Sequence, residues 1–108
     1  MNAIELIKSE RDRQVSVKKF SIFADDRYRS GELIDAALSY SNAAAKQARG
    51  QDQPVLKGMA ASGEVPWPWQ DHWWKPSNDP IRNLVKAAAL IAAEIERLQR
   101  VEESNTPN

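Results

Sequence analysis

Apolar residues recur at helical spacing in three stretches of this chain, most clearly over residues 80–100. The apolar stripe of that stretch advances by alternating steps of four and three residues, through Leu84, Ala88, Ile91, Ile95 and Leu98. These steps place side chains on one face of a helix, so the pattern predicts a helix. Asp79 is expected to cap it, because a carboxylate accepts hydrogen bonds from the first turn, and Pro80 suits the first helical position.

Two earlier stretches also predict helices, over residues 2–14 and 30–48. Asn2 is a candidate cap for the first of them, and Ser30 for the second. The second carries an apolar stripe made of Leu33, Ala37, Tyr40, Ala44 and Ala48. Gly50 is a natural stop beyond that stripe, because glycine readily adopts the left-handed conformation that ends many helices.

The chain between the second and third predicted helices has no sustained period, and it contains an unusual segment. Residues 66–76, here called the strap, hold all four tryptophans, three of the six prolines and the only histidine. Prolines forbid a continuous helix there, so the rings are expected to cap either the protein's own helices or a flat partner such as a base or a protein surface. Residues 15–23 also lack helical spacing, and they fit either a short strand or an irregular connection.

These elements predict an all-α fold. We expect a three-helix bundle with a long Trp/Pro-rich strap over residues 1–100, followed by a flexible polar tail over residues 101–108. The final helix has small apolar residues on more than one side, Ala89 and Ala93 included, and they would allow close approach to the second helix or to a second subunit. Because so short a chain also has a small core, we expect helix-mediated self-association into a homo-oligomer.

Composition narrows the functional classes. Fifteen Lys and Arg balance fifteen Asp and Glu, so general nucleic-acid binding is disfavoured. The chain has no cysteine, which excludes disulfides and thiolate metal sites. Its longest uncharged apolar run, residues 87–93, is far shorter than a membrane span, and Glu5 interrupts an apolar start that is too short for a signal peptide. These features predict a soluble, cytoplasmic protein with no membrane partner.

Acidic residues form the first candidate site. Glu32 and Asp35 are three residues apart on a predicted helix face, a spacing that can hold a magnesium ion through oxygen ligands. Glu10 could complete such a set, and Asp25 and Asp26 lie just upstream of the pair. The alternative is that Glu32 and Asp35 simply favour the positive end of the helix dipole.

The strap and its basic neighbours form the second candidate site. Tryptophan faces beside cations suit a nucleotide, whose base would stack on the rings while its phosphates meet the cations. The candidate ligand-binding residues are Trp67, Trp69, Trp73, Trp74, Lys75, Arg82 and Lys86. The alternative is a solvated basic rim over a tryptophan-capped core. His72 has no nucleophile pattern beside it, so it is expected to stabilise the strap or face solvent rather than act as a base.

The strap and the last predicted helix resemble a set of small, mostly uncharacterised proteins of bacteriophages and prophages. The resemblance is carried by WPW and WWKP in the strap, by RNLVKA at residues 82–87 and by AEIERL at residues 93–98. It implies a phage-encoded accessory protein that acts in the cytoplasm of a bacterial host. A fainter similarity, through GELID at residues 31–35, is to all-α nucleoside triphosphate pyrophosphatases of the MazG type. Their upstream Glu-Glu-x-x-Glu is represented here only by Glu5 and Glu10.

From the residues and the resemblance together we expect a non-catalytic binding protein without a cofactor. It would neutralise a host defence component, either by sequestering a nucleotide-derived immune signal or by blocking a host defence protein. The alternative function is a magnesium-dependent nucleoside triphosphate pyrophosphatase whose metal ligands are Glu10, Glu32 and Asp35.

Overall fold

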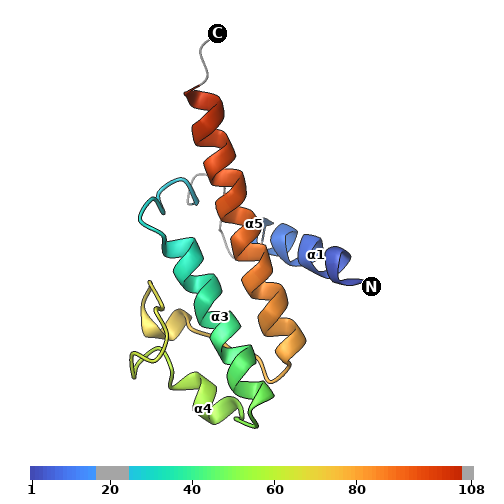
Figure 1. Ribbon diagram of the computed structural model, residues 1–108, viewed down its shortest axis with the longest axis vertical. Coiled ribbons are helices and arrows are strands. Elements are labelled where there is room, and N and C mark those ends of the chain that lie inside the picture. Colours follow the sequence, from blue (N-terminus) through green and yellow to red (C-terminus); the bar gives the residue numbers. More distant parts are fainter. Residues whose placement is uncertain (17–24, 106–108) are drawn as a thin grey trace.

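The computed structural model describes residues 1–16 and 25–105, and the regular structure within these ranges is helical (Figure 1). The helices are α1 (Ala3–Ser16), α3 (Glu32–Ala48), α4 (Gln53–Lys57) and α5 (Pro80–Ser104), with a 3-10 turn at Asp71–Trp73. The predicted all-α class is therefore confirmed, and the three long helices start or end close to the predicted positions.

Side-chain caps set the starts of α1 and α5, as predicted. The Glu5 amide donates to the Asn2 side-chain oxygen at 2.9 Å, and the Glu5 carboxylate in turn accepts from the Asn2 amide at 3.4 Å. This reciprocal arrangement is a capping box, which satisfies two amides that the helix leaves free. Asp79 caps α5 by accepting from the Ile81 amide at 2.9 Å, directly before Pro80 in the first turn.

The cap predicted for α3 is wrong. Gly31, and not Ser30, occupies the N-cap position, with a φ of 86°, and it makes no side-chain cap. Glu32 instead accepts a hydrogen bond from the Ser30 amide at 2.7 Å. The chain reverses into α3 through a left-handed residue, a conformation that glycine adopts without the steric cost of a Cβ. At the other end Gly50, with a φ of 89°, follows the last turn as predicted.

α3 and α5 lie side by side and antiparallel, and α1 packs against α5 at an angle, to the right of it in the view of Figure 1. Alanines and two leucines make up most of the α3–α5 contact. The small alanine side chains let the two helix axes approach closely. The fully or nearly fully buried residues of this contact are Leu33, Ala36, Ala37, Ala43, Ala87, Leu90 and Ala93. Leu56 and Met59, from α4 and the turn after it, complete the core next to the strap.

The apolar stripe that predicted α5 faces outward. Leu84, Ile91 and Ile95 are 53%, 47% and 52% exposed, whereas Ala87, Leu90 and Ala93 on the other side of the helix are buried. The helix therefore packs through its alanine side, and its bulky aliphatic side is left without a cover among the described residues.

Two boundaries meet the predictions only in part, and two charged residues of α5 tie it to other elements. Glu96 and Arg100 lie four residues apart on α5, and each pairs with another element: Arg11 contacts Glu96, and Asp26 contacts Arg100. In the stretch predicted as a strand or a connection, residues 15 and 16 belong to α1 and the rest lies outside the described residues. α5 continues to Ser104, past the start of the predicted tail.

Along residues 1–16 and 25–105, no helix combines the length and the apolar character needed to cross a lipid bilayer.

Candidate functional site

Three of the four tryptophans of the strap pack against the helices. Trp74 is 6% exposed, belongs to the core and donates its indole N–H to the Leu56 carbonyl at 2.8 Å. Trp67 and Trp69 are half-buried and pack against that core. Trp67 also donates to the Gln70 carbonyl at 3.0 Å. A buried indole that satisfies its N–H in this way contributes its full apolar area to the core.

Two tyrosines join these indoles into one aromatic cluster. Trp67 stands at its centre, with ring centroids 5.7 Å from Tyr40, 5.3 Å from Trp69 and 5.1 Å from Trp74. Tyr28 extends the cluster by contacting Trp69 at 5.1 Å. Edge-to-face and tilted arrangements at these separations are the favoured geometries of aromatic pairs. Burial raises the pKa of Tyr40 to about 12, so its hydroxyl stays neutral inside this cluster.

Long polar side chains fasten the C-terminal end of the strap to the helices. Lys86 donates its ammonium to the Lys75 carbonyl at 2.9 Å and lies 5.2 Å from the Tyr40 ring centre. Gln53 donates to the Pro76 carbonyl at 3.1 Å. Fully buried Asn83 exchanges hydrogen bonds with the backbone of Ser77, at 2.8 and 3.0 Å. The strap is thus tied to both α4 and α5 through its own carbonyl groups, which an extended segment cannot satisfy internally.

Trp73 is the exception among the tryptophans. It is 60% exposed and stacks only on His72, at 4.9 Å between ring centres. The short 3-10 turn Asp71–Trp73 turns these two aromatic side chains outward while the next residue, Trp74, turns inward. Of the two positions expected for His72, supporting the strap or facing solvent, the structure shows an exposed side chain.

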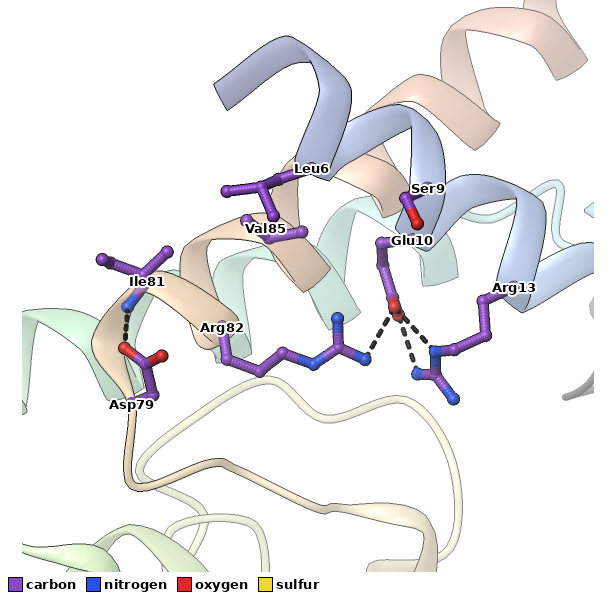
Figure 2. A pocket seen from close by; sticks show the side chains of 8 residues that line it. All are labelled: Leu6, Ser9, Glu10, Arg13, Asp79, Ile81, Arg82 and Val85. Atoms are coloured by element: carbon purple, nitrogen blue, oxygen red, sulfur yellow. Dashed lines mark hydrogen bonds and ion pairs between the residues drawn. The ribbon is translucent and has the colours of Figure 1, made fainter. Parts of the chain in front are cut away.

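Arg82, another predicted ligand-binding cation, belongs to an ion cluster between α1 and α5. Figure 2 shows Arg82 and Arg13 converging on the carboxylate of Glu10, whose side chain is 1% exposed. Arg82 contacts Glu10 at 2.7 Å, and Arg13 makes a two-bond contact with it at 2.8 and 2.9 Å. Burial raises the pKa of Glu10, but the hydrogen bonds and charges of the two guanidinium groups together bring that pKa below its ordinary value.

A small pocket opens beside this cluster, between α1 and the start of α5. Its lining consists of Leu6, Ser9, Glu10, Arg13, Asp79, Ile81, Arg82 and Val85 (Figure 2). The pocket has a volume of about 190 Å³, below the roughly 300–1,000 Å³ of sites that enclose a drug-sized ligand. Its arginines already share a buried carboxylate, so the pocket is suited to water or a small ion rather than to a nucleotide.

The acidic candidates are also engaged within the protein. Asp25, which is fully buried, accepts from Arg11 at 2.9 Å, and Asp26 accepts from Arg100 at 2.8 Å. Burial raises the pKa of Asp25, and the charge of Arg11 opposes that rise. Each aspartate therefore joins the segment before α3 to another helix through a guanidinium group.

The structure does not bring the three candidate metal ligands together. Glu10 contacts Arg82, whereas Glu32 at the start of α3 lies near Arg97. These two arginines are fifteen residues apart on α5, which is roughly 22 Å along the helix axis. Asp35 shares α3 with Glu32. Over the described ranges, 1–16 and 25–105, no group of three or more histidine, aspartate or glutamate side chains could hold a metal ion.

The sequence analysis named some residues of the aromatic cluster and of the Glu10 cluster, but it missed other residues that complete them. Tyr28 and Arg13 were not candidates, yet Tyr28 closes the aromatic cluster and Arg13 completes the Glu10 cluster. Arg13 and Glu10 are three residues apart in a helix, so their spacing alone could have predicted that pair. No local signal joins Tyr28 to the strap, forty-one residues later, because that contact exists only once the chain is folded.

Comparison of the chain with protein-family models, with curated proteins and with solved structures found no match in any of the three.

Proposed function

We propose that this protein is a non-catalytic binding protein that occupies the surface of a partner protein through the exposed edge of the strap. The observation that carries this proposal is the outward position of Trp73 in a strap whose other three tryptophans pack against the core and whose Lys75 carbonyl is held by Lys86. Tryptophan is the side chain most enriched among residues that dominate protein interfaces, and a rigid support lowers the entropy lost on binding.

The contacts of the other candidates favour a protein partner over a nucleotide. Trp67, Trp69 and Trp74 turn toward the helices, so the faces that a base would stack on are largely used. The Lys86 ammonium donates a hydrogen bond to the Lys75 carbonyl, and Arg82 forms an ion pair with Glu10 of α1. A phosphate would have to break those contacts to bind there. We therefore place the blocking of a protein ahead of the sequestering of a nucleotide-derived signal.

In the cellular role that we propose, the protein is a phage-encoded accessory protein that blocks a defence protein in the cytoplasm of its bacterial host. The support is the resemblance of the strap and α5 to small phage and prophage proteins. In this proposal the three long helices act as one bundle that presents the strap, and the protein works as a homo-oligomer. The uncovered aliphatic side of α5 supports self-association.

Replacing Trp73 with alanine is expected to weaken partner binding by about 30-fold or more, since truncating a dominant interface residue costs at least about 2 kcal/mol. The free energy of unfolding should change by less than about 1 kcal/mol, because the ring is mostly in solvent. To measure this, the purified protein is cross-linked to its partner in lysate of the bacterial host, and the cross-linked partner is identified. The affinity of that partner is then measured for the unaltered protein and for Trp73→Ala.

The matched control is Val55→Ala, another exposed apolar residue close to the strap (43% exposed). It should bind like the unaltered chain. A partner that binds the Trp73→Ala protein with unchanged affinity would contradict the proposal. Native mass spectrometry of the protein isolated from host cells supplies a second reading, because a retained nucleotide-sized mass and no retained protein would favour sequestration instead.

The pyrophosphatase alternative predicts turnover, which the separation of Glu10 from Glu32 does not favour. With magnesium and a panel of nucleoside triphosphates we expect no catalytic release of pyrophosphate. Release at many turnovers per chain that disappears in an Asp35→Ala variant, with the melting temperature of that variant unchanged, would establish the enzyme and refute the binding protein.

A further inference from the structure

The longest uncovered apolar surface of the described chain runs along α5. Four of its residues, Ile81, Leu84, Ile95 and Leu98, are 60%, 53%, 52% and 50% exposed, and Ile91 between them is 47% exposed. A contiguous exposed apolar patch of this length is typical of a surface that another molecule covers. We call this row, with half-buried Ala88, the outer stripe.

The outer stripe has the spacing of a coiled-coil seam. From Ile81 to Leu98 its steps are three, four, three, four and three residues. This alternation follows the coiled-coil period of about 3.5 residues, which keeps one row of side chains turned toward a facing helix. A helix that packs only against the core of its own domain needs one apolar face. α5 already has that face in its alanine side, packed on α3, so the second face calls for a second helix.

α3 extends the same surface. Gln47 accepts from the side chain of Asn83 at 2.8 Å, and the two helices run antiparallel from that point, so Ile34 lies level with Ile95. Ile34 and Leu38 are 45% and 49% exposed. They lie about 120–160° around α3 from Tyr40, whose ring the strap covers, so they point away from the strap. Both helices of the α3–α5 pair therefore carry exposed aliphatic side chains.

We propose that this surface is the interface of a homodimer, in which the outer stripe of α5 packs antiparallel on the outer stripe of a second copy. This inference develops the homo-oligomer of the proposed function and does not depend on the strap. In the antiparallel alignment every residue of the stripe has a partner from end to end. The facing pairs are Ile81 with Leu98, Leu84 with Ile95, and Ala88 with Ile91, each formed twice.

Side-chain size favours this direction over a parallel one. The smallest member, Ala88, meets the large Ile91 of the other copy, and alternating small and large residues fill an interface without voids. In a parallel dimer Ala88 would face its own copy and leave a gap between two layers of leucine and isoleucine.

Charge favours the same direction. α5 ends on Glu102 and Glu103, both exposed, and a parallel dimer would bring these carboxylates of the two copies together. The antiparallel dimer places them near the start of the partner's α5, where the helix dipole is positive.

The surface is large enough for a dimer. The stripe is about 26 Å long and the α3–α5 pair about 20 Å wide, so the flat area of the face is on the order of 500 Å². Side-chain relief adds to this, toward the roughly 800 Å² per partner of a standard interface. The result is a four-helix arrangement built from two α3–α5 pairs, with both straps on the outside.

Sedimentation equilibrium at micromolar concentration should report twice the chain mass of 12.2 kDa. Ile91→Lys should reduce this to one chain and keep the helical circular dichroism, because the side chain is already half exposed. The matched control is Ile4→Lys, which changes another isoleucine, 75% exposed on α1, and should remain a dimer. A single-chain mass for the unaltered protein, or a dimeric Ile91→Lys protein, would overturn the proposal.

Disulfide trapping tests the direction, since the chain has no cysteine of its own. Leu84→Cys and Ile95→Cys proteins, mixed and oxidised, should cross-link to each other and not to themselves. Self-linking of each variant alone would mean a parallel dimer and overturn the antiparallel geometry. Trp73→Ala should stay dimeric, so loss of partner binding and loss of the dimer are separate results.

Discussion

Replacing Trp74 with alanine is expected to lower the free energy of unfolding by about 3–5 kcal/mol, the usual cost of removing a buried aromatic side chain. The ring is 6% exposed and contacts Tyr40 at 4.8 Å and Trp67 at 5.1 Å between ring centres. Its loss would leave a cavity next to Leu56, whose carbonyl would also lose the indole hydrogen bond. Urea denaturation followed by far-ultraviolet circular dichroism measures the change.

Trp73→Ala is the matched control for that prediction, because it makes the same chemical change one residue earlier, at a ring that is 60% exposed. It should change the free energy of unfolding by less than about 1 kcal/mol. An equal decrease in the free energy of unfolding in both variants would contradict the assignment of Trp74 to the core and of Trp73 to the surface.

Replacing Glu10 with glutamine is expected to lower the free energy of unfolding by about 2–3 kcal/mol at neutral pH, as for a charge-assisted hydrogen-bond network that loses its acceptor charge. Glu10 is the buried carboxylate on which Arg13 and Arg82 converge, so the change leaves two cations facing each other. The control is Glu64→Gln. Its partner Lys46 is 3.5 Å away and both side chains are exposed, so the effect should stay below about 1 kcal/mol.

The pH dependence gives this prediction a direction. The pKa of Glu10 in the folded protein lies below its ordinary value of 4.5, so folding favours its charged form. The stabilisation is therefore complete above pH 4.5 and is lost as the pH falls through the folded-state pKa. The difference between Glu10→Gln and the unaltered protein should shrink over that acid range. A difference that is the same at neutral and acid pH would mean that Glu10 contributes by packing and not by charge.

Asp25 should behave in the opposite way. Burial raises its pKa above the ordinary 3.8, so its protonated form suits the folded state better. An Asp25→Asn variant therefore changes stability least below pH 3.8, where the unaltered side chain is also neutral. Acid unfolding of the two variants therefore tests the opposite pKa shifts of Glu10 and Asp25.

The strap and the outer stripe give the protein two independent surfaces. The strap is tied to α4 and α5 by Gln53 and Lys86, while the outer stripe lies on the opposite side of the α3–α5 pair. A homodimer built through the stripe would present two copies of Trp73 at once. Two linked copies of one binding surface raise avidity only where a partner offers two sites that their spacing can span.

Features that depend on neighbours in the sequence were predictable from the sequence. The caps at Asn2 and Asp79, the stop at Gly50 and the helical period of residues 80–100 act through hydrogen bonds and sterics within one turn, so residue types alone indicate them. Ser30 was the failure of this kind, because two adjacent residues could start the helix and the backbone path into α3 decided for Gly31.

Choices between faces were decided only by the tertiary structure. The period of α5 shows that Leu84, Ile91 and Ile95 share a side, but a period cannot tell whether that side or the alanine side meets α3. Close approach of the two helix axes favoured the alanines. In the same way, the sequence shows that four tryptophans share one segment. Only the contacts of Trp74 with Tyr40 and Leu56 in the folded chain show that Trp74 turns inward while Trp73 turns outward.

The Glu10 cluster shows the same division most clearly. That Glu10 and Arg13 share a face of α1 follows from their spacing, which the sequence alone determines. That Arg82, seventy-two residues later, neutralises the same carboxylate follows from the packing of α1 against α5. A carboxylate suited to a metal ion by its residue type becomes part of an internal ion cluster, because burial beside two guanidinium groups leaves its oxygens already engaged.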